Sequence, residues 1–138
     1  MKMINRLQIS RGFILVVLFL NVQCAFQFLF FPERYVYGFE LAGEPGRIAV
    51  QGIGILFLMW NIPYLFAAID PLKHFISLVE SVIMQGIGLA GETMLYLSLA
   101  VEHQPLKITG MRFIVFDAGG LLALLLAFLL VKRHSRKR

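Results

Sequence analysis

The stretch that decides the fold is Phe75–Leu99, FISLVESVIMQGIGLAGETMLYLSL. It is long and apolar enough to cross a bilayer, which takes about 20 residues of helix, yet it contains Glu80, Gln85 and Glu92. A carboxylate among lipid tails costs at least about 2.5 kcal/mol unless other groups satisfy it. Small and polar residues recur at three- and four-residue steps and share one helical face: Ser81, Gln85, Gly88, Glu92 and Tyr96. This face must turn towards other helices, so the stretch predicts a membrane bundle with a polar interior.

The composition is typical of an integral membrane protein. Of the 138 residues, 59% are hydrophobic and 15% are charged, whereas soluble domains carry about 25% charged residues. The net charge of +5 does not indicate nucleic-acid binding, because five basic residues lie in the last seven positions, KRHSRKR, directly after an apolar run. Such a flank is usual at the cytosolic end of a membrane helix and suits anionic lipid headgroups. We therefore expect membrane lipids, and no nucleic acid, as partners.

The apolar runs predict an all-α fold, an integral membrane four-helix bundle in which the whole chain is one transmembrane domain. The predicted spans cover residues 12–31, 48–69, 75–99 and 113–131, and a basic tail follows at 132–138. Pro63 should kink the second span, because it lacks an amide donor and crowds the carbonyl four residues earlier. Gly119, Ala123 and Ala127 form a stripe of small residues that lets another helix approach within the bundle.

The distribution of basic residues predicts the orientation in the membrane. An even number of spans places both termini on one side, which then carries nine lysines and arginines against four on the other. The positive-inside rule puts both termini in the cytoplasm. Aromatic residues should form belts at the two interfaces, with Trp60 and Tyr64 on the cytoplasmic side and this set on the outer side: Phe28, Phe30, Phe31, Tyr35, Tyr37 and Phe39.

Every predicted span places polar side chains in its outer half, and we expect them to converge on one buried cluster, the candidate ligand-binding site. Arg47 is the natural partner for Glu92 or Asp117, because a guanidinium can bind a carboxylate through two donors; Arg112 is a second candidate. The cluster either fixes the helix register through hydrogen bonds or forms a functional site. Its predicted members are Gln23, Gln27, Arg47, Gln51, Gln85, Glu92 and Asp117.

Other candidate sites are weaker. His74, His103 and His134 lie on different loops and on both sides of the membrane, so they cannot form a three-histidine centre, and we predict no metal site. Cys24 is the single cysteine and cannot form an intrachain disulfide or a cysteine pair for redox chemistry. Glu80 is expected to be an interfacial charge satisfied by Lys73, Lys132 or Arg133.

Several motifs resemble those of the DoxX-like group of small four-helix membrane proteins. The first span ends in FQFLFFPE, and the second, GRIAVQGIGILFLMWNIPYLFAAIDP, opens with Arg-x4-Gly-x-Gly and closes with Ala-Ala-x-Asp-Pro. The resemblance implies a four-helix bundle in the cytoplasmic (inner) membrane of a bacterium. Some members of the group are associated with quinone-linked oxidation. The resemblance extends to Arg47 but assigns no catalytic role to Glu92 or Asp117.

These observations favour a binding or accessory subunit whose outer pocket holds a lipid or quinone-like headgroup; beyond a quinone or lipid, we expect no cofactor. A proton-coupled small transporter or channel using Glu92 is one alternative, although small multidrug transporters carry their essential acid in the first span, where this chain has Asn21 and glutamines. A membrane enzyme with acid–base chemistry at Glu92 and Asp117 is the other. A homodimer or a larger membrane complex is expected, because spans of this length bury little surface alone.

Overall fold

The computed structural model describes residues 2–135, and the side chains from residue 6 onwards. This part of the chain is helical and contains no strand. The elements in order are α1 (Lys2–Phe30), the short 3-10 helices η1 (Pro32–Arg34) and η2 (Val36–Phe39), α2 (Gly43–Trp60), α3 (Ile62–Ile69), α4 (Phe75–Ser98) and α5 (Gln104–Ser135).

Within residues 2–135, four helical segments are long and apolar enough to cross a membrane, which confirms the predicted all-α, multi-pass architecture. They are Arg6–Phe30, Gly43–Ile69, Phe75–Ser98 and Gln104–Ser135. The last helix begins at Gln104, well before the predicted start of the span at residue 113, so the expectation that the connection between the last two spans extends over residues 100–112 was wrong for 104–112. Pro105 lies at the second position of α5, where a missing amide donor is tolerated and the fixed φ angle suits a helix start.

The second span is broken where Pro63 predicted a kink. α2 ends at Trp60 and α3 begins at Ile62, with Asn61 between them. The Asn61 side-chain amide donates to the Phe57 carbonyl (2.5 Å), and its oxygen accepts a hydrogen bond from Asn21 Nδ2 of α1 (3.1 Å). The amide pair therefore ties the break to the first helix and gives both amide side chains a partner inside the bundle.

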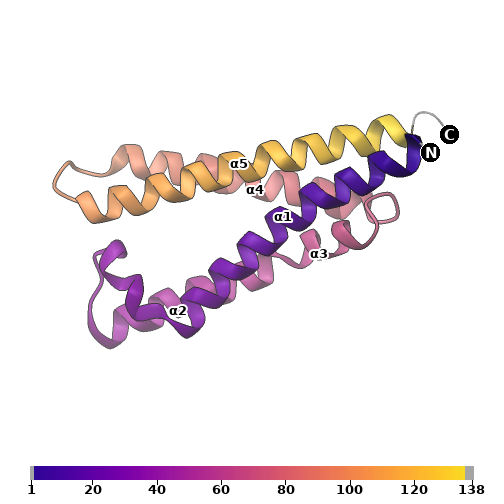
Figure 1. Cartoon of the computed structure of the whole chain (residues 1–138). Coiled ribbons are helices and arrows are strands. Elements are labelled where there is room, and N and C mark those ends of the chain that lie inside the picture. Colours follow the sequence, from indigo (N-terminus) through magenta and orange to yellow (C-terminus); the bar gives the residue numbers. More distant parts are fainter. Residues whose placement is uncertain (1, 136–138) are drawn as a thin grey trace.

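The two ends of the bundle are packed differently. We call the half that contains both termini and the turn 70–74 the terminal half, and the half that contains the loops 31–42 and 99–103 the loop half. In the terminal half α1, α3, α4 and α5 pack around one core, whereas in the loop half α2 packs chiefly on α1. Figure 1 shows α1 and α2 diverging from α4 and α5 towards the loops.

The core of the terminal half is built from buried side chains of all these helices. Its members are Ile14, Val17, Tyr64, Ala67, Ala68, Leu78, Leu124, Ala127 and Val131. Ser10 Oγ of α1 donates to the carbonyl of Ala127 (3.1 Å), so the predicted small-residue stripe on α5 makes a close contact within this bundle at Ala127, whereas Gly119 has open space around it. The turn after α3 is held by Asp70, whose carboxylate accepts hydrogen bonds from the amides of Lys73 and Leu72; these bonds lower the Asp70 pKa.

The first loop crosses the loop end of the bundle and is attached to α5. Thr109 Oγ1 donates to the carbonyl of Gly38 (2.7 Å), and a side chain at Gly38 would collide with that hydroxyl. His103 Nδ1 lies 2.5 Å from Glu40 Oε2. This hydrogen bond raises the His103 pKa, because it favours the charged imidazolium. The loop therefore bridges the two helix pairs that diverge beneath it.

Candidate functional site

The centre of the site is a polar contact between α4 and α5. Gln85 Nε2 of α4 donates to Asp117 Oδ1 of α5 (2.8 Å). Two glycines make room for this exchange: a Cβ at Gly88 would collide with Asp117 Oδ2, and a Cβ at Gly120 would collide with the Gln85 amide. The predicted polar face of α4 therefore does turn inward, and it meets Asp117 as expected.

Glu92 lies one helical turn beyond Gly88 on the same face and reaches the same carboxyl. The Glu92 and Asp117 carboxyl groups lie within hydrogen-bonding reach of each other. Such a bond needs a proton on one of the two groups, since a carboxylate only accepts. Glu92 Oε2 is buried and has no hydrogen-bond partner among the described residues. The pair thus places two carboxyl groups side by side, and no donor among the described residues reaches Glu92 Oε2.

Behind the acid pair, a chain of hydrogen bonds runs into α3. Tyr64 is fully buried, and its hydroxyl donates to Gln85 Oε1 (2.7 Å) while accepting from Trp60 Nε1 (3.3 Å). The prediction that Tyr64 lies at the membrane interface was wrong, because the break at Asn61 turns α3 and its tyrosine towards α4. The four-residue spacing of Trp60 and Tyr64 was the signal that these two side chains would meet.

Glu92 faces a cavity of about 280 Å³ between α2 and α4, where these two helices do not pack closely. Apart from Glu92, its wall is almost entirely apolar and aromatic: Phe39, Ile53, Phe57, Leu95, Tyr96, Leu99, Thr109, Gly110 and Phe113. The cavity therefore joins one carboxyl group to a wall suited to a hydrophobic molecule.

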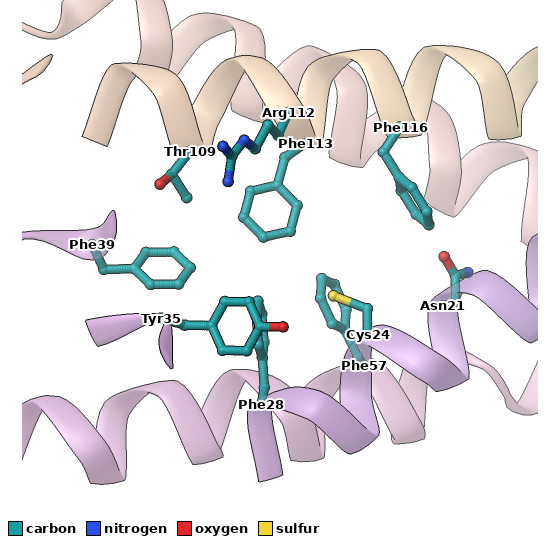
Figure 2. Close-up of a pocket in the computed structure, with 10 residues that line it drawn as sticks. All are labelled: Asn21, Cys24, Phe28, Tyr35, Phe39, Phe57, Thr109, Arg112, Phe113 and Phe116. Carbon is teal, nitrogen blue, oxygen red and sulfur yellow. The ribbon is translucent and has the colours of Figure 1, made fainter. Parts of the chain in front are cut away.

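A second cavity, of about 210 Å³, lies on the other side of Phe113, between α1, α5 and the first loop (Figure 2). The two cavities share Phe39, Phe57, Thr109 and Phe113 as a common wall. The remaining lining residues of the second cavity are Asn21, Cys24, Phe28, Tyr35, Arg112 and Phe116. The aromatic rings of Phe28, Tyr35, Phe39 and Phe113 point into the space between the diverging helices.

These rings form an aromatic cage centred on Phe28, which is only 2% exposed. Its ring centroid lies 4.8 Å from that of Tyr35, 5.9 Å from Phe39, 6.0 Å from Phe57 and 6.2 Å from Phe113. The sequence predicted an interfacial belt for this region. The rings of Phe30, Phe31 and Tyr37 are exposed, as such a belt requires, whereas Phe28 and Phe39 line the interior.

The expected pairing of Arg47 with Glu92 or Asp117 was wrong. Arg47 Nε donates to Glu44 Oε2 (3.0 Å), one turn earlier in the same helix, and Arg47 Nη1 donates to Gln51 Oε1 (3.2 Å). The physical reason is that α2 packs on α1 and leans away from α4. Gly54 fixes this packing, because a Cβ there would collide with the Ala25 carbonyl of α1. Arg112, the second candidate partner, forms no salt bridge within the described residues.

Gln27 and Gln51 belong to the same α1–α2 group as Arg47, not to the acid pair. Gln51 Nε2 donates to the Leu29 carbonyl (3.0 Å), and Gln27 Oε1 accepts a hydrogen bond from the Tyr35 hydroxyl. Within residues 6–135, no hydrogen bond joins this group to Gln85, Glu92 or Asp117. The single cluster predicted from equal depth is therefore two groups, which lie on opposite sides of the aromatic cage.

Two further polar residues lie where the sequence did not place them. Gln23 is exposed and forms no hydrogen bond with any described residue, so its assignment to a buried site was wrong. Its neighbour two positions earlier, Asn21, occupies the inward face instead. Glu80 is also exposed, and among the described residues it makes no salt bridge with Lys73, Lys132 or Arg133.

Within residues 2–135, no group of three or more His, Cys, Asp or Glu side chains converges. Comparison with known proteins finds no match to this chain among protein-family models, curated proteins or solved structures. The resemblance to the DoxX-like group therefore stays a prediction that depends on the sequence motifs alone.

Proposed function

We propose that this protein is a small membrane binding or accessory subunit that takes up a lipid or quinone-like amphiphile through the opening between α2 and α4. The observation that carries the proposal is Glu92, which lines an otherwise apolar cavity and whose buried Oε2 meets no donor among the described residues. A buried polar atom left unsatisfied costs about 1–3 kcal/mol, and a turn of this side chain into the cavity, where a headgroup bonds to it, removes that penalty.

The acid pair can bind a headgroup that accepts a hydrogen bond or a headgroup that donates one. When a headgroup replaces the contact between the two carboxyl groups, the protonated member donates to a carbonyl oxygen, as in a quinone or an ester, or the ionised member accepts from a hydroxyl, as in a quinol or a glycerol. The rings around Phe113 provide faces on which a planar headgroup or an acyl chain can pack. An amphiphile reaches this site from the bilayer, because the cavity lies where α2 and α4 separate.

In this proposal both termini lie in the cytoplasm and the loop half lies in the outer leaflet of a bacterial inner membrane. The excess of lysine and arginine at the terminal end supports this orientation. The ligand would therefore enter from the outer leaflet.

The test uses the single tryptophan, Trp60, which lies at the end of the hydrogen-bond chain from the acid pair. Short-chain ubiquinone, added to the protein in lipid nanodiscs, should quench its fluorescence in a saturable way. Glu92→Leu should weaken binding by about 10-fold or more, because a hydrogen bond to a charged group contributes about 1.5–3 kcal/mol. Glu80→Leu, on the exposed face of the same helix, is the matched control. Equal saturable affinity in both variants would contradict the proposal.

If quinone does not quench, the same pair of variants is compared by mass spectrometry of lipids that remain bound after purification. The proposed site then predicts a phospholipid or other amphiphile retained by the wild type and by Glu80→Leu, and lost from Glu92→Leu. Identical lipid content in all three proteins would leave the acid pair as a helix contact only.

A proton-coupled transporter is the second candidate, and the adjacent carboxyl groups of Glu92 and Asp117 favour it, because acids within a membrane often carry protons. Against it, the hydrogen bonds behind the pair run through the Gln85 amide and end at the Trp60 indole, two groups that do not exchange protons readily. Proton flux into liposomes that disappears in Glu92→Gln would support transport over binding.

A further inference from the structure

Helix α1 carries two stripes on opposite faces. The inward stripe is buried and packs against the rest of the bundle: Ser10, Ile14, Val17, Asn21, Ala25 and Phe28. The one side-chain amide in this stripe, that of Asn21, is paired with Asn61 of the second span. On the inner face of this helix, a side-chain amide is therefore satisfied by an amide of a neighbouring span.

The outward stripe is exposed and runs along one face of the helix. Its residues follow each other at alternating steps of four and three: Gly12, Val16, Phe19, Gln23, Phe26 and Phe30. Such steps keep side chains on one face of an α-helix, so the stripe is a continuous face on which another helix can pack. Its one polar residue distinguishes it from a face that only contacts lipid.

Gln23 is the residue of this stripe that lipid cannot satisfy. It follows Asn21 by two positions, about 200° around the helix, and its amide has no hydrogen bond to any described residue. It also lies seven residues before the end of α1 at Phe30, about 10 Å into the helix. Amide side chains at such positions hydrogen-bond across helix interfaces in membranes.

We propose that a second copy of this chain packs on the outward stripe of α1, in a parallel homodimer whose two Gln23 amides pair across a two-fold axis. An amide offers both donors and an acceptor and is therefore complementary to itself. Two copies inserted in the same orientation are related by an axis along the membrane normal, and in a parallel pair each stripe residue meets its own counterpart.

The ends of the stripe fit this arrangement. Gly12 has open space beyond its Cα, which lets the two helices approach at the terminal end. At the loop end, the rings of Phe26 and Phe30 are stacked with centroids 5.6 Å apart and offer a continuous aromatic surface. Arg11, beside the stripe, donates from Nε to the Ala68 carbonyl (2.9 Å), which draws this charge towards α3 and away from the stripe.

Disulfide cross-linking of the full chain in its own membranes tests the interface. In a Cys24→Ala background, single cysteines replace Phe19, Gln23 or Phe26, and the controls replace Ile87 of α4 or Leu122 of α5, which are 62% and 61% exposed. Mild oxidation should join two copies at the stripe positions and not at the control positions. The absence of dimers at the stripe, equal dimer yields at the controls, or joining only to another protein would overturn the proposal.

The amide itself is tested by energy transfer between labelled copies diluted in liposomes. Gln23→Leu should weaken self-association about 3- to 30-fold, the range that interhelical hydrogen bonds contribute in membranes. Gln23→Asn, which keeps an amide, should retain most of the association, and neither variant should change the unfolding temperature of the monomer. Unchanged or stronger association in Gln23→Leu would overturn the role of the amide pair.

Discussion

The two halves of this bundle bury their helices in different ways. In the terminal half, α1, α3, α4 and α5 close around a largely aliphatic core; Ser10 Oγ finds a carbonyl partner there, whereas the buried His134 Nε2 has none among the described residues. In the loop half α2 leaves α4, and Glu92, whose Oε2 also lacks a partner, lines a cavity walled chiefly by apolar and aromatic side chains. The halves therefore differ in where a carboxyl group lies beside an apolar opening between two helices, which is the arrangement that an amphiphile needs.

The break at Asn61 is the origin of this difference. It lets α3 pack on α4 while α2 stays against α1, where Gly54 allows contact with the Ala25 backbone. One proline-dependent kink therefore converts a closed ring of helices into an open one within a single span. The predictions below test this contrast, from the largest expected effect to the smallest.

The same truncation in the two halves should have unequal effects on stability. Leu124→Ala removes a fully buried side chain from the terminal core and should lower the free energy of unfolding by about 2–5 kcal/mol. Leu95→Ala, at a cavity wall where Leu95 is 62% exposed, should change it by about 0.5 kcal/mol or less. Reversible unfolding in bicelles measures both values, and similar losses would remove the distinction between the halves.

Gln85 links the two halves, so its removal should affect both stability and binding. Gln85→Leu leaves Asp117 Oδ1 without its donor, whereas the Tyr64 hydroxyl keeps the Ser81 carbonyl (3.2 Å) as an acceptor. The orphaned Asp117 oxygen costs about 1–3 kcal/mol, and the displaced Asp117 carboxyl no longer holds Glu92 at the cavity. We expect a lower unfolding temperature together with weaker quinone or lipid binding. A change in stability with unchanged binding would show that the acid pair does not depend on Gln85.

Substitutions at two glycines of α4 distinguish the effect of moving the acid pair from the effect of helix propensity. Gly88→Ala places a Cβ against Asp117 Oδ2, whereas Gly91→Ala meets nothing within 4 Å. Alanine favours a helix interior by about 1 kcal/mol over glycine, so Gly91→Ala should be neutral or stabilising. Gly88→Ala should not show this stabilisation and should weaken the binding of quinone or lipid, because the Asp117 carboxyl must move.

Calorimetry or fluorescence titration of these two variants, side by side, decides the point. Equal behaviour of Gly88→Ala and Gly91→Ala would mean that Asp117 can move without consequence for the site.

The smallest expected effect concerns pH and the first loop. The hydrogen bond to Glu40 raises the His103 pKa, so the pair holds the loop on α5 at low pH and is released as the pH rises through the folded-state pKa of His103. Amide hydrogen exchange around Gly38 and Glu40 should therefore increase with pH beyond its intrinsic dependence, and His103→Gln should remove that extra increase. The Thr109–Gly38 hydrogen bond remains, so the loop should loosen without detaching.

The helices and the inward face of α4 could be predicted from the sequence, because hydrophobic length and the spacing of Gln85, Gly88 and Glu92 are local properties. Asp117 as the partner of this face followed from matched depth in the bilayer. Depth alone, however, cannot say which neighbouring span a side chain meets. Arg47 lies at a suitable height and still bonds Glu44, one turn away, because α2 leans towards α1.

The aromatic cage and the role of Tyr64 depend on geometry that no local pattern contains. An aromatic residue at the end of a predicted span can be exposed, as Tyr37 is, or buried in the interior, as Phe28 is. The direction of α3 after the break at Asn61 decided whether Tyr64 met Gln85. Gln23 was misplaced for a related reason: its depth suited the predicted cluster, but the buried face of α1 passes through Asn21.

The central claim is that an amphiphile enters between α2 and α4 and reaches Glu92. It is tested most directly by photo-cross-linking in membranes with a quinone or lipid analogue that carries a diazirine beside its headgroup, followed by peptide mapping. The account predicts adducts concentrated on Glu92, Tyr96 and Phe57, and their loss when unlabelled amphiphile competes. Adducts spread evenly over the exposed side chains of both halves, and unaffected by competition, would contradict it.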